Sequence, residues 1–223
     1  MRQLPLPLAP PAQPGLEGFV EGGNGAVLAH LAALQPGSAP VYLWGPVGCG
    51  KTHLLRALAS AWQRDGLGVG WFDAADALPW NLSEGWALMV LDSCHTLDDE
   101  HQQAAFALCG APAERGVTWV AAGQMPPVDL PLRDDLRTRL GWGPAFALQP
   151  LGEAEARAAM RREADRRGVL LSDEVMDYLL TRFDRNLAHL MPMLSRLDAF
   201  ALAEQRRLTI PLLKKMLAEP ETA

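Results

Sequence analysis

The stretch of sequence that most restricts the fold is PVYLWGPVGCGKTH at residues 40–53. It contains the spacing G-x-x-x-x-G-K-T between an apolar run typical of a strand and a helical pattern. Glycines in such a loop let the backbone N–H groups turn onto phosphate oxygens at the start of a helix. The spacing predicts a P-loop, in which Lys51 reaches the β- and γ-phosphates of a nucleotide and Thr52 holds Mg²⁺. A chance glycine turn is the alternative, and both flanks argue against it. The predicted nucleotide-binding residues of this loop are Gly45, Pro46, Val47, Gly48, Cys49, Gly50, Lys51, Thr52 and His53.

A second apolar run, WALMVLDS at residues 86–93, is short and continuous. Such runs are typical of strands buried in a parallel sheet. Its apolar residues end at Asp92, whose carboxylate we expect to hold Mg²⁺ through water, on the same metal as Thr52. An acid at the end of a strand often only caps the next turn, and the P-loop earlier in the chain favours the metal interpretation.

Strand and helix patterns alternate as far as Pro150, which predicts an α/β fold with a parallel five-stranded sheet and helices on both faces. After Pro150 every pattern is helical, which predicts an all-helical domain. We therefore expect a flexible tail at 1–16, a nucleotide-binding domain at 17–150 and a helical domain at 151–223. The expected strands are 41–44, 69–72, 86–92, 117–122 and 145–148, and the expected helices are 24–34, 54–64, 99–109, 133–139, 153–167, 172–183, 187–204 and 209–217.

Three residues mark helix ends in the second domain. Ser172 and Thr209 are good N-caps for the helices that follow them, and Gly168 is a good stop for the helix before it. Pro192 lies inside the third helical pattern, where proline removes a backbone donor. We expect this helix to be kinked or split.

Composition narrows the class of protein. The formal net charge of −6 argues against a main role in non-specific binding to nucleic-acid backbones, although a local basic patch stays open. There is no apolar run long enough to span a bilayer, and the prolines near Met1 break the apolar helix that a secretory signal needs. We expect a cytoplasmic protein that does not contact membranes.

Other reactive side chains are assigned ordinary structural roles. Cysteines 49, 94 and 109 have no metal-ligand spacing, so we expect buried free thiols rather than a redox site. His53, His95 and His101 lack both metal spacing and a nucleophile partner, and we interpret them as ordinary polar or half-buried residues. Six tryptophans are too widely spread for a base-stacking platform and are expected in core or interface packing: Trp44, Trp71, Trp80, Trp86, Trp119 and Trp142.

The chain starts with MRQLPLPL, an extended leucine and proline string. Prolines fix φ and remove donors, so the string has no means of folding by itself, and its leucines are available to a partner. We expect a tail that is disordered when unbound. A linker without any partner is the alternative interpretation.

A P-loop domain followed by a helical domain resembles the AAA+ family, in which the second domain is called the lid. The stretch LRTRLGWG at 136–143 is similar to the arginine-finger motif of the bacterial replication initiator DnaA. Arg139 matches the finger, and a solvent-exposed helix arginine is the alternative. Arg185, within FDRNL, matches the lid arginine that touches bound nucleotide in this family, and a solvated helix end is the alternative there.

The tail narrows the resemblance to the DnaA-homologous regulatory inactivators, the Hda family, which carry a Gln-Leu-x-Leu-Pro-Leu string for the DNA polymerase sliding clamp. The resemblance implies a protein that is tethered to the clamp and presents Arg139 in trans to the ATP held by DnaA, so that this ATP is hydrolysed and replication is not re-initiated. It implies ADP or ATP with Mg²⁺ as cofactors, nucleoid association through the clamp, and only indirect contact with DNA. The implied clamp-binding residues are Gln3, Leu4, Leu6, Pro7 and Leu8.

Two positions depart from the family pattern. Ser93 stands where AAA+ ATPases usually have a second acid, and Gln124 stands near the nucleotide sensor after the fourth expected strand. A serine hydroxyl is too weakly acidic to act as a base at neutral pH, so we expect little or no ATP hydrolysis by the isolated chain. The chain also ends soon after the lid, so we expect no sequence-specific DNA binding of the helix-turn-helix kind.

Two other functions stay open at this point. One is an ATP-hydrolysing loader, which predicts turnover by the isolated chain and is disfavoured by Ser93. The other is a non-enzymatic adaptor at clamps or origins, which predicts that Arg139 is dispensable. The sequence does not decide between a monomer and a homo-oligomer.

Overall fold

A computed structural model describes residues 15–16, 19–110, 116–183 and 186–219. The chain divides after Pro150 into two compact units, which are considered separately below. The six residues singled out as clamp or lid contacts lie outside the described residues: Gln3, Leu4, Leu6, Pro7, Leu8 and Arg185.

The first unit is built on a five-stranded sheet in which every pairing is parallel. The strand order is β2-β3-β4-β1-β5, so β1 lies between β4 and β5. The P-loop sequence follows β1 directly, and the loop therefore starts inside the sheet rather than at its edge. The strands are β1 (Val41–Trp44), β2 (Gly68–Phe72), β3 (Trp86–Leu91), β4 (Thr118–Gly123) and β5 (Ala145–Ala147).

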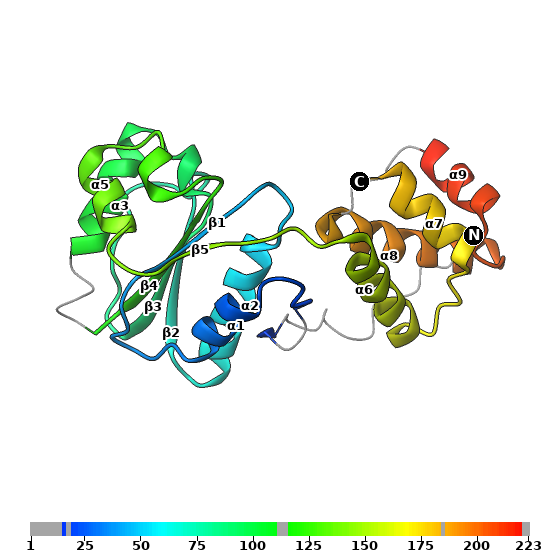
Figure 1. Ribbon diagram of the computed structural model, residues 1–223, viewed down its shortest axis with the longest axis horizontal. Helices are drawn as coiled ribbons and strands as arrows, with labels where there is room; N and C mark the ends of the chain where they lie inside the picture. The colour runs from blue at the N-terminus through cyan, green and yellow to red at the C-terminus, as the bar shows by residue number, and fades with distance from the viewer. Residues whose placement is uncertain (1–14, 17–18, 111–115, 184–185, 220–223) are drawn as a thin grey trace. The chain divides into compact units, whose positions relative to one another are not determined.

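Helices cover both faces of this sheet (Figure 1). On one face α1 (Gly25–Ala32) and α2 (Lys51–Arg64) pack, and on the other α3 (Asp99–Gly110) and α5 (Asp134–Leu140) pack. The parallel sheet with helices on both faces confirms the predicted fold class. Short 3₁₀ turns follow two of the strands, η2 (Cys94–Thr96) after β3 and η3 (Pro127–Asp129) after β4.

Neighbouring residues of each strand point to opposite faces and so enter different cores. In β1, Leu43 packs with α1 and α2, whereas Tyr42 packs with α3 and α5, and both side chains are fully buried. In β4, Val120 and Trp119 divide in the same way. The continuous apolar runs of the sequence are therefore explained by burial on both sides.

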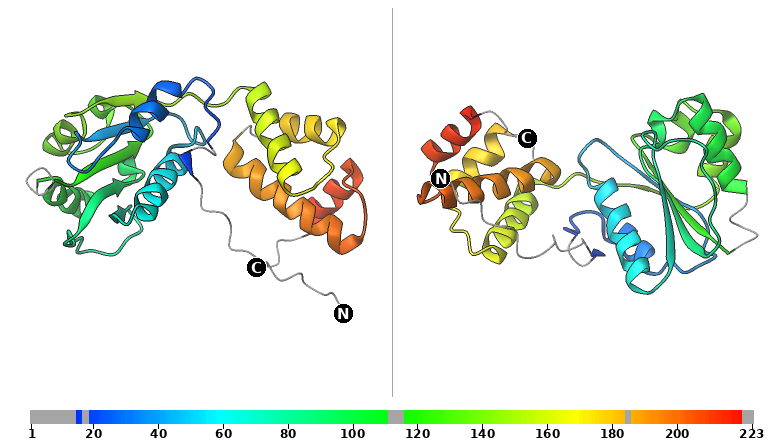
Figure 2. Two further views of the ribbon diagram at one scale, coloured as in Figure 1. Left: turned by 90° about the horizontal axis from the view of Figure 1, so that it is seen from below. Right: turned by 180° about the vertical axis from the view of Figure 1, so that it is seen from behind.

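The second unit contains only helices among its described residues, and they pack around one core (Figure 2). Ser172 and Thr209 accept hydrogen bonds from the amides of Val175 and Leu212, as their predicted capping roles require. Gly168 has φ +69 just beyond the first of these helices and ends it as expected. The helices are α6 (Glu153–Arg166), α7 (Asp173–Arg182), α8 (Leu187–Glu204) and α9 (Ile210–Ala218).

Of the two outcomes predicted for the helix at Pro192, a kink or a split, the split is wrong, because α8 runs without interruption through this residue. Proline removes one helical hydrogen bond. Leu190, Leu194 and Leu197 of the same helix are each fully buried in the core of this unit. Packing of this apolar face outweighs the loss of one bond.

Element ends agree with the predicted ones or differ from them by at most three residues. The first helix, for example, ends at Ala32 rather than Leu34, because a turn closed by the Gln35 amide and the Ser38 hydroxyl follows it. The three cysteines are buried free thiols, as predicted. In the described part of the chain, no helix combines the length and the apolar character that crossing a bilayer requires.

Candidate nucleotide site and arginine-bearing helix

The glycine-rich loop turns between β1 and α2, and two of its glycines are required by geometry. Gly45 has φ +150, and a Cβ there would lie 2.6 Å from the Leu148 carbonyl oxygen. Gly50 has φ +102, and a Cβ there would lie 2.8 Å from a ring carbon of Phe19. Both values fall in the region that favours glycine, so larger residues would be strained or would clash.

The loop ends at the first residue of α2, which is Lys51. The Lys51 ammonium donates to the carbonyl oxygens of Gly45 at 2.7 Å and Pro46 at 2.8 Å, so it lies over the loop itself. The first turn of α2 contains no acidic side chain. The partial positive charge of this helix start is therefore not compensated, which suits an anionic group.

Thr52 and Asp92 meet beside the loop although they lie forty positions apart. The Thr52 hydroxyl donates to Asp92 Oδ2 at 2.7 Å, and the Ser93 amide donates to Asp92 Oδ1 at 2.7 Å. Asp92 is only 6% exposed. One carboxylate and one hydroxyl are hard oxygen ligands of the kind that Mg²⁺ takes beside nucleotide phosphates, and the pair fits this ion.

The described residues contain no cluster of three or more His, Cys, Asp or Glu side chains able to hold a metal by themselves. A metal at Thr52 and Asp92 would therefore need further ligands, which phosphates and water supply in nucleotide sites. The donor set agrees with a nucleotide-dependent Mg²⁺ site.

The remaining loop residues differ in exposure. Cys49 is buried, whereas Val47 is 74% exposed at the tip. The His53 ring stacks on Phe19 with centroids 5.7 Å apart, and burial, followed by the nearby Arg56 charge, lowers the pKa of His53. Gln124, the residue in the sensor region, is exposed.

His95 is a neighbour of this site that the sequence interpretation treated as ordinary. Burial and then the Lys51 charge lower the pKa of His95, and the Asp92 charge opposes them. Its Nδ1 is buried without a hydrogen-bond partner among the described residues. We expect the neutral form of His95 near pH 7.

Helix α5 carries the arginine that was singled out as a finger. Arg133, just before it, forms a two-pronged contact with Asp135, and Arg137 pairs with Asp134. Arg139 has no hydrogen bond or ion pair to any described residue, and its guanidinium lies over the Phe106 ring, 4.4 Å from the centroid. A cation–π contact of this kind leaves the N–H donors of the guanidinium available.

The chain just beyond Arg139 presents apolar side chains to solvent. Trp142, whose amide donates to the Arg139 carbonyl, is 72% exposed. Val128 of η3 is 76% exposed, and η3 packs against the end of α5, where a Cβ at Gly141 would lie 3.6 Å from Pro127 Cβ. The other tryptophans of the predicted packing set are buried or half-buried, so Trp142 stands apart from them.

Two supporting residues on α3 were missed from the sequence. Gln102 is 6% exposed and joins α3 to α5, because its amide donates to the Leu97 carbonyl and accepts from the Arg133 amide. Phe106 lies one helical turn further on the same face, beneath Arg139. Their spacing of four residues was the available signal, but it does not tell which helix they face.

Comparisons with known protein families match two parts of the chain. The model for the bacterial DnaA ATPase domain matches residues 12–68, which include the P-loop. The model for the lid domain of Hda matches residues 153–217. The chain is an Hda/DnaA-like AAA+ protein. The likeness to Hda rests on the lid match, and the likeness to DnaA rests on the match that includes the P-loop.

Solved structures show the same fold at low sequence identity. Domain III of the replication initiation protein DnaA from Thermotoga maritima matches with a TM-score of 0.76 and 21% identity, over 95% of this chain and 98% of that chain. AMPPCP-bound DnaA from Aquifex aeolicus matches with a TM-score of 0.70 and 24% identity, over 84% of this chain and 65% of that one. A RuvB mutant from Thermotoga maritima matches with a TM-score of 0.68 and 18% identity, over 92% and 72%. The Hda/DnaA-like chain thus has the AAA+ fold shared by initiators and a branch-migration motor protein.

Proposed function

We propose that this Hda/DnaA-like protein inactivates the initiator DnaA by stimulating hydrolysis of DnaA-bound ATP, with Arg139 as an arginine finger in trans. The observation that carries the proposal is the unpaired charge of the Arg139 side chain among the described residues. It is the arginine of the α5 region whose charge is not neutralised by a described carboxylate, and it lies beside the exposed Trp142. A guanidinium with free donors can stabilise charge that develops on a transferred phosphoryl group.

The fold supports action of Arg139 on a nucleotide held by another protein. Helix α5 packs on the face of the sheet opposite to α2, whose first residue is Lys51 of the P-loop. The finger helix and the chain's own nucleotide loop thus belong to opposite sides of the sheet. A neighbouring protein is the more accessible target for Arg139.

We further propose that ADP or ATP with Mg²⁺ binds at the P-loop of this chain. Lys51 then exchanges its two carbonyl partners for phosphate oxygens, while Thr52 and Asp92 hold the metal. Bound Mg²⁺ neutralises phosphate charge at this site. The related Aquifex aeolicus DnaA holds AMPPCP, a nucleotide analogue, which supports this assignment.

Tethering completes the proposal. Residues 3–8 bind the sliding clamp left on replicated DNA, and Arg185 of the lid contacts the chain's own nucleotide. A tether raises the effective concentration of the finger near DnaA without any new contact at the finger itself. The domain division is 1–16 for the tail, 17–150 for the nucleotide-binding domain and 151–223 for the lid.

The deciding experiment measures hydrolysis of ATP bound to DnaA, in the presence of clamp-loaded DNA and this protein. Arg139→Ala is expected to reduce hydrolysis to the rate of DnaA alone, because fingers contribute on the order of 10³ to 10⁵ in rate in related systems. Arg137→Ala is the matched control, since this arginine lies on the same helix but is paired with Asp134. It should leave the rate largely unchanged, because the charge of Arg137 is already paired within the helix and the loss of an exposed ion pair costs little stability.

Two further arms separate the rival functions. Deleting residues 1–8 should lower hydrolysis only at limiting protein concentration, because it removes the tether and not the finger. Equal rates with Arg139→Ala and the unchanged chain would refute the finger and favour an adaptor. Rapid ATP turnover by the isolated chain would favour a loader instead.

A further inference from the structure

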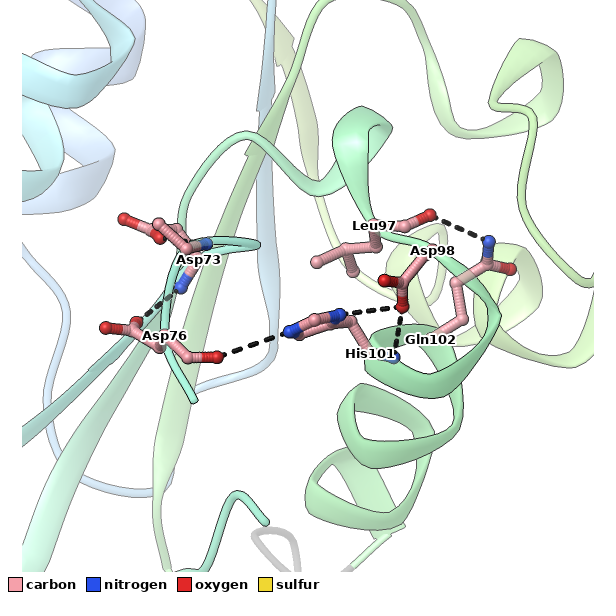
Figure 3. A network of polar contacts seen from close by, with 7 residues as sticks. Asp73, Asp76, Leu97, Asp98, His101 and Gln102 are labelled. Carbon is pink, nitrogen blue, oxygen red and sulfur yellow. Dashed lines mark hydrogen bonds and ion pairs between the residues drawn. The ribbon is translucent and has the colours of Figure 1, made fainter. Parts of the chain in front are cut away.

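His101 joins two segments on the α3 side of the sheet. Its Nδ1 lies 2.7 Å from Asp98 Oδ1 at the start of α3, and its Nε2 lies 3.2 Å from the Asp76 carbonyl oxygen in the loop after β2. Figure 3 shows the ring between these two oxygens. The His101 side chain is only 15% exposed, whereas that of Asp98 is 67% exposed.

Both partners of the ring are acceptors only. An ionised carboxylate and a backbone carbonyl carry no hydrogen, so each ring nitrogen is satisfied only if it carries one. A neutral imidazole has one N–H and would leave its other nitrogen facing an oxygen lone pair. The observed pair of contacts is therefore complete only with the imidazolium form.

The polar and charged groups around the His101 ring also favour its protonated form. The Asp98 hydrogen bond, the Asp76 carbonyl and the charges of Asp98 and Glu100 together raise the pKa of His101 against the effect of burial. The hydrogen bonds from His101 lower the pKa of Asp98. On the loop side, the Asp76 carboxylate accepts from the Asp73 amide, so it is held within its own turn.

The contact has consequences beyond the two hydrogen bonds. The His101 ring packs on Trp80 with centroids 5.3 Å apart, and Trp80, which is 8% exposed, packs on Phe72 at the end of β2. The next residue of α3, Gln102, holds the start of α5 through the Arg133 amide. His101 thus lies where the loop after β2, its buried tryptophan and the helix that supports α5 meet.

We propose that His101 is a pH-sensitive clasp, whose protonated ring fastens the loop at residues 73–80 to α3 and whose deprotonation releases this loop. The inference goes beyond the proposed function and does not depend on it. Because the folded chain favours the protonated ring, the clasp is complete below the ordinary histidine pKa of about 6.5 and is lost as pH rises through the higher pKa of the folded protein.

The test follows the histidine ring signals of the full chain by NMR from pH 5.5 to 9, together with amide exchange of residues 73–80 corrected for intrinsic rates. His101→Gln assigns the signal among the five histidines. We expect the His101 midpoint to lie above the ordinary value. We also expect loop protection to fall about two- to tenfold as pH rises through that midpoint, the range for loss of one hydrogen bond.

Two neighbouring acids supply a matched pair of variants. Asp98→Asn keeps an oxygen for the His101 amide, with which Asp98 caps α3, but removes the carboxylate charge. Asp99→Asn removes an equal charge from the same helical turn without removing a contact of the ring. The midpoint should fall toward the ordinary value in Asp98→Asn and change little in Asp99→Asn.

Two results would overturn the inference. One is loop protection that does not change across the His101 midpoint of the unchanged chain, which needs no variant to fold. The other is an equal midpoint in Asp98→Asn and Asp99→Asn, which would mean that general negative charge, and not the Asp98 contact, holds the proton.

Discussion

At the scale of single residues, the candidate sites differ in how their charges are balanced. Lys51 is bonded to carbonyl oxygens of its own loop, and Asp92 accepts from Thr52 and from the Ser93 amide. Among the described residues, the side chain of Arg139 contacts an aromatic ring and no carboxylate. The first arrangement fits a site that receives a ligand within the chain, and the second fits a side chain offered to a partner.

Trp142 permits a prediction that separates docking from catalysis. An exposed tryptophan beside a functional arginine is the type of residue that dominates protein interfaces. Trp142→Ala should raise the concentration of this protein that half-saturates DnaA-bound ATP hydrolysis about tenfold or more, with the maximal rate unchanged. Arg139→Ala should instead lower the maximal rate.

The control for this prediction is Leu170→Ala, which removes a 92% exposed apolar side chain from the loop between α6 and α7. Its half-saturating concentration should equal that of the unchanged chain. A Trp142→Ala protein with unchanged half-saturation would show that this tryptophan is not part of the docking surface.

At the scale of elements, local signals explain most of what the sequence predicted. The apolar runs gave the strands and the caps gave the helix ends, because both depend on neighbouring residues. The order β2-β3-β4-β1-β5 was not predicted, since strand order depends on contacts between distant segments. The P-loop could be predicted because it is contiguous, whereas the support of Arg139 by Phe106 joins two helices and leaves no local signature.

The cap of α9 gives a prediction for stability. The Thr209 hydroxyl accepts from the Leu212 amide at the start of this helix. Thr209→Ala should lower the free energy of unfolding by about 1 kcal/mol, because one helix donor loses its partner. Urea unfolding followed by circular dichroism measures the change.

Thr181→Ala is a suitable comparison, because Thr181 is exposed within α7 and alanine has the higher helix propensity there. It should unfold at the same urea concentration as the unchanged chain or a higher one. Equal losses from both substitutions would mean that threonine content, rather than the cap, determines the effect.

At the scale of the whole molecule, stability should respond to acid through the lid. Arg166 and Arg167 bond to Glu163, and the Arg166 hydrogen bond is the largest cause that lowers the pKa of Glu163 to about 2. A lowered carboxyl pKa adds stability that is complete above the ordinary value and is lost as pH falls through the folded one. The lid should therefore weaken between about pH 4.5 and pH 2.

Glu163→Gln tests this acid response. At pH 6 it should cost about 1 kcal/mol of unfolding free energy, a modest value because water screens ion pairs at a partly exposed site. Near pH 2 the difference from the unchanged chain should shrink, since the glutamate is then largely protonated. Urea titrations at both pH values measure it, and a constant difference would mean that the substitution acts through packing.

The two cores of the sheet have a consequence for how such a protein can change over evolutionary time. Val90 and Leu91 are adjacent in β3, yet one belongs to the core under the nucleotide loop and the other to the core under the arginine-bearing helix. Substitutions that reshape one core leave the packing of the other largely in place. Substitutions in the core under the arginine-bearing helix could therefore change partner recognition while nucleotide binding is conserved. Substitutions in the other core could abolish nucleotide binding while the partner is kept.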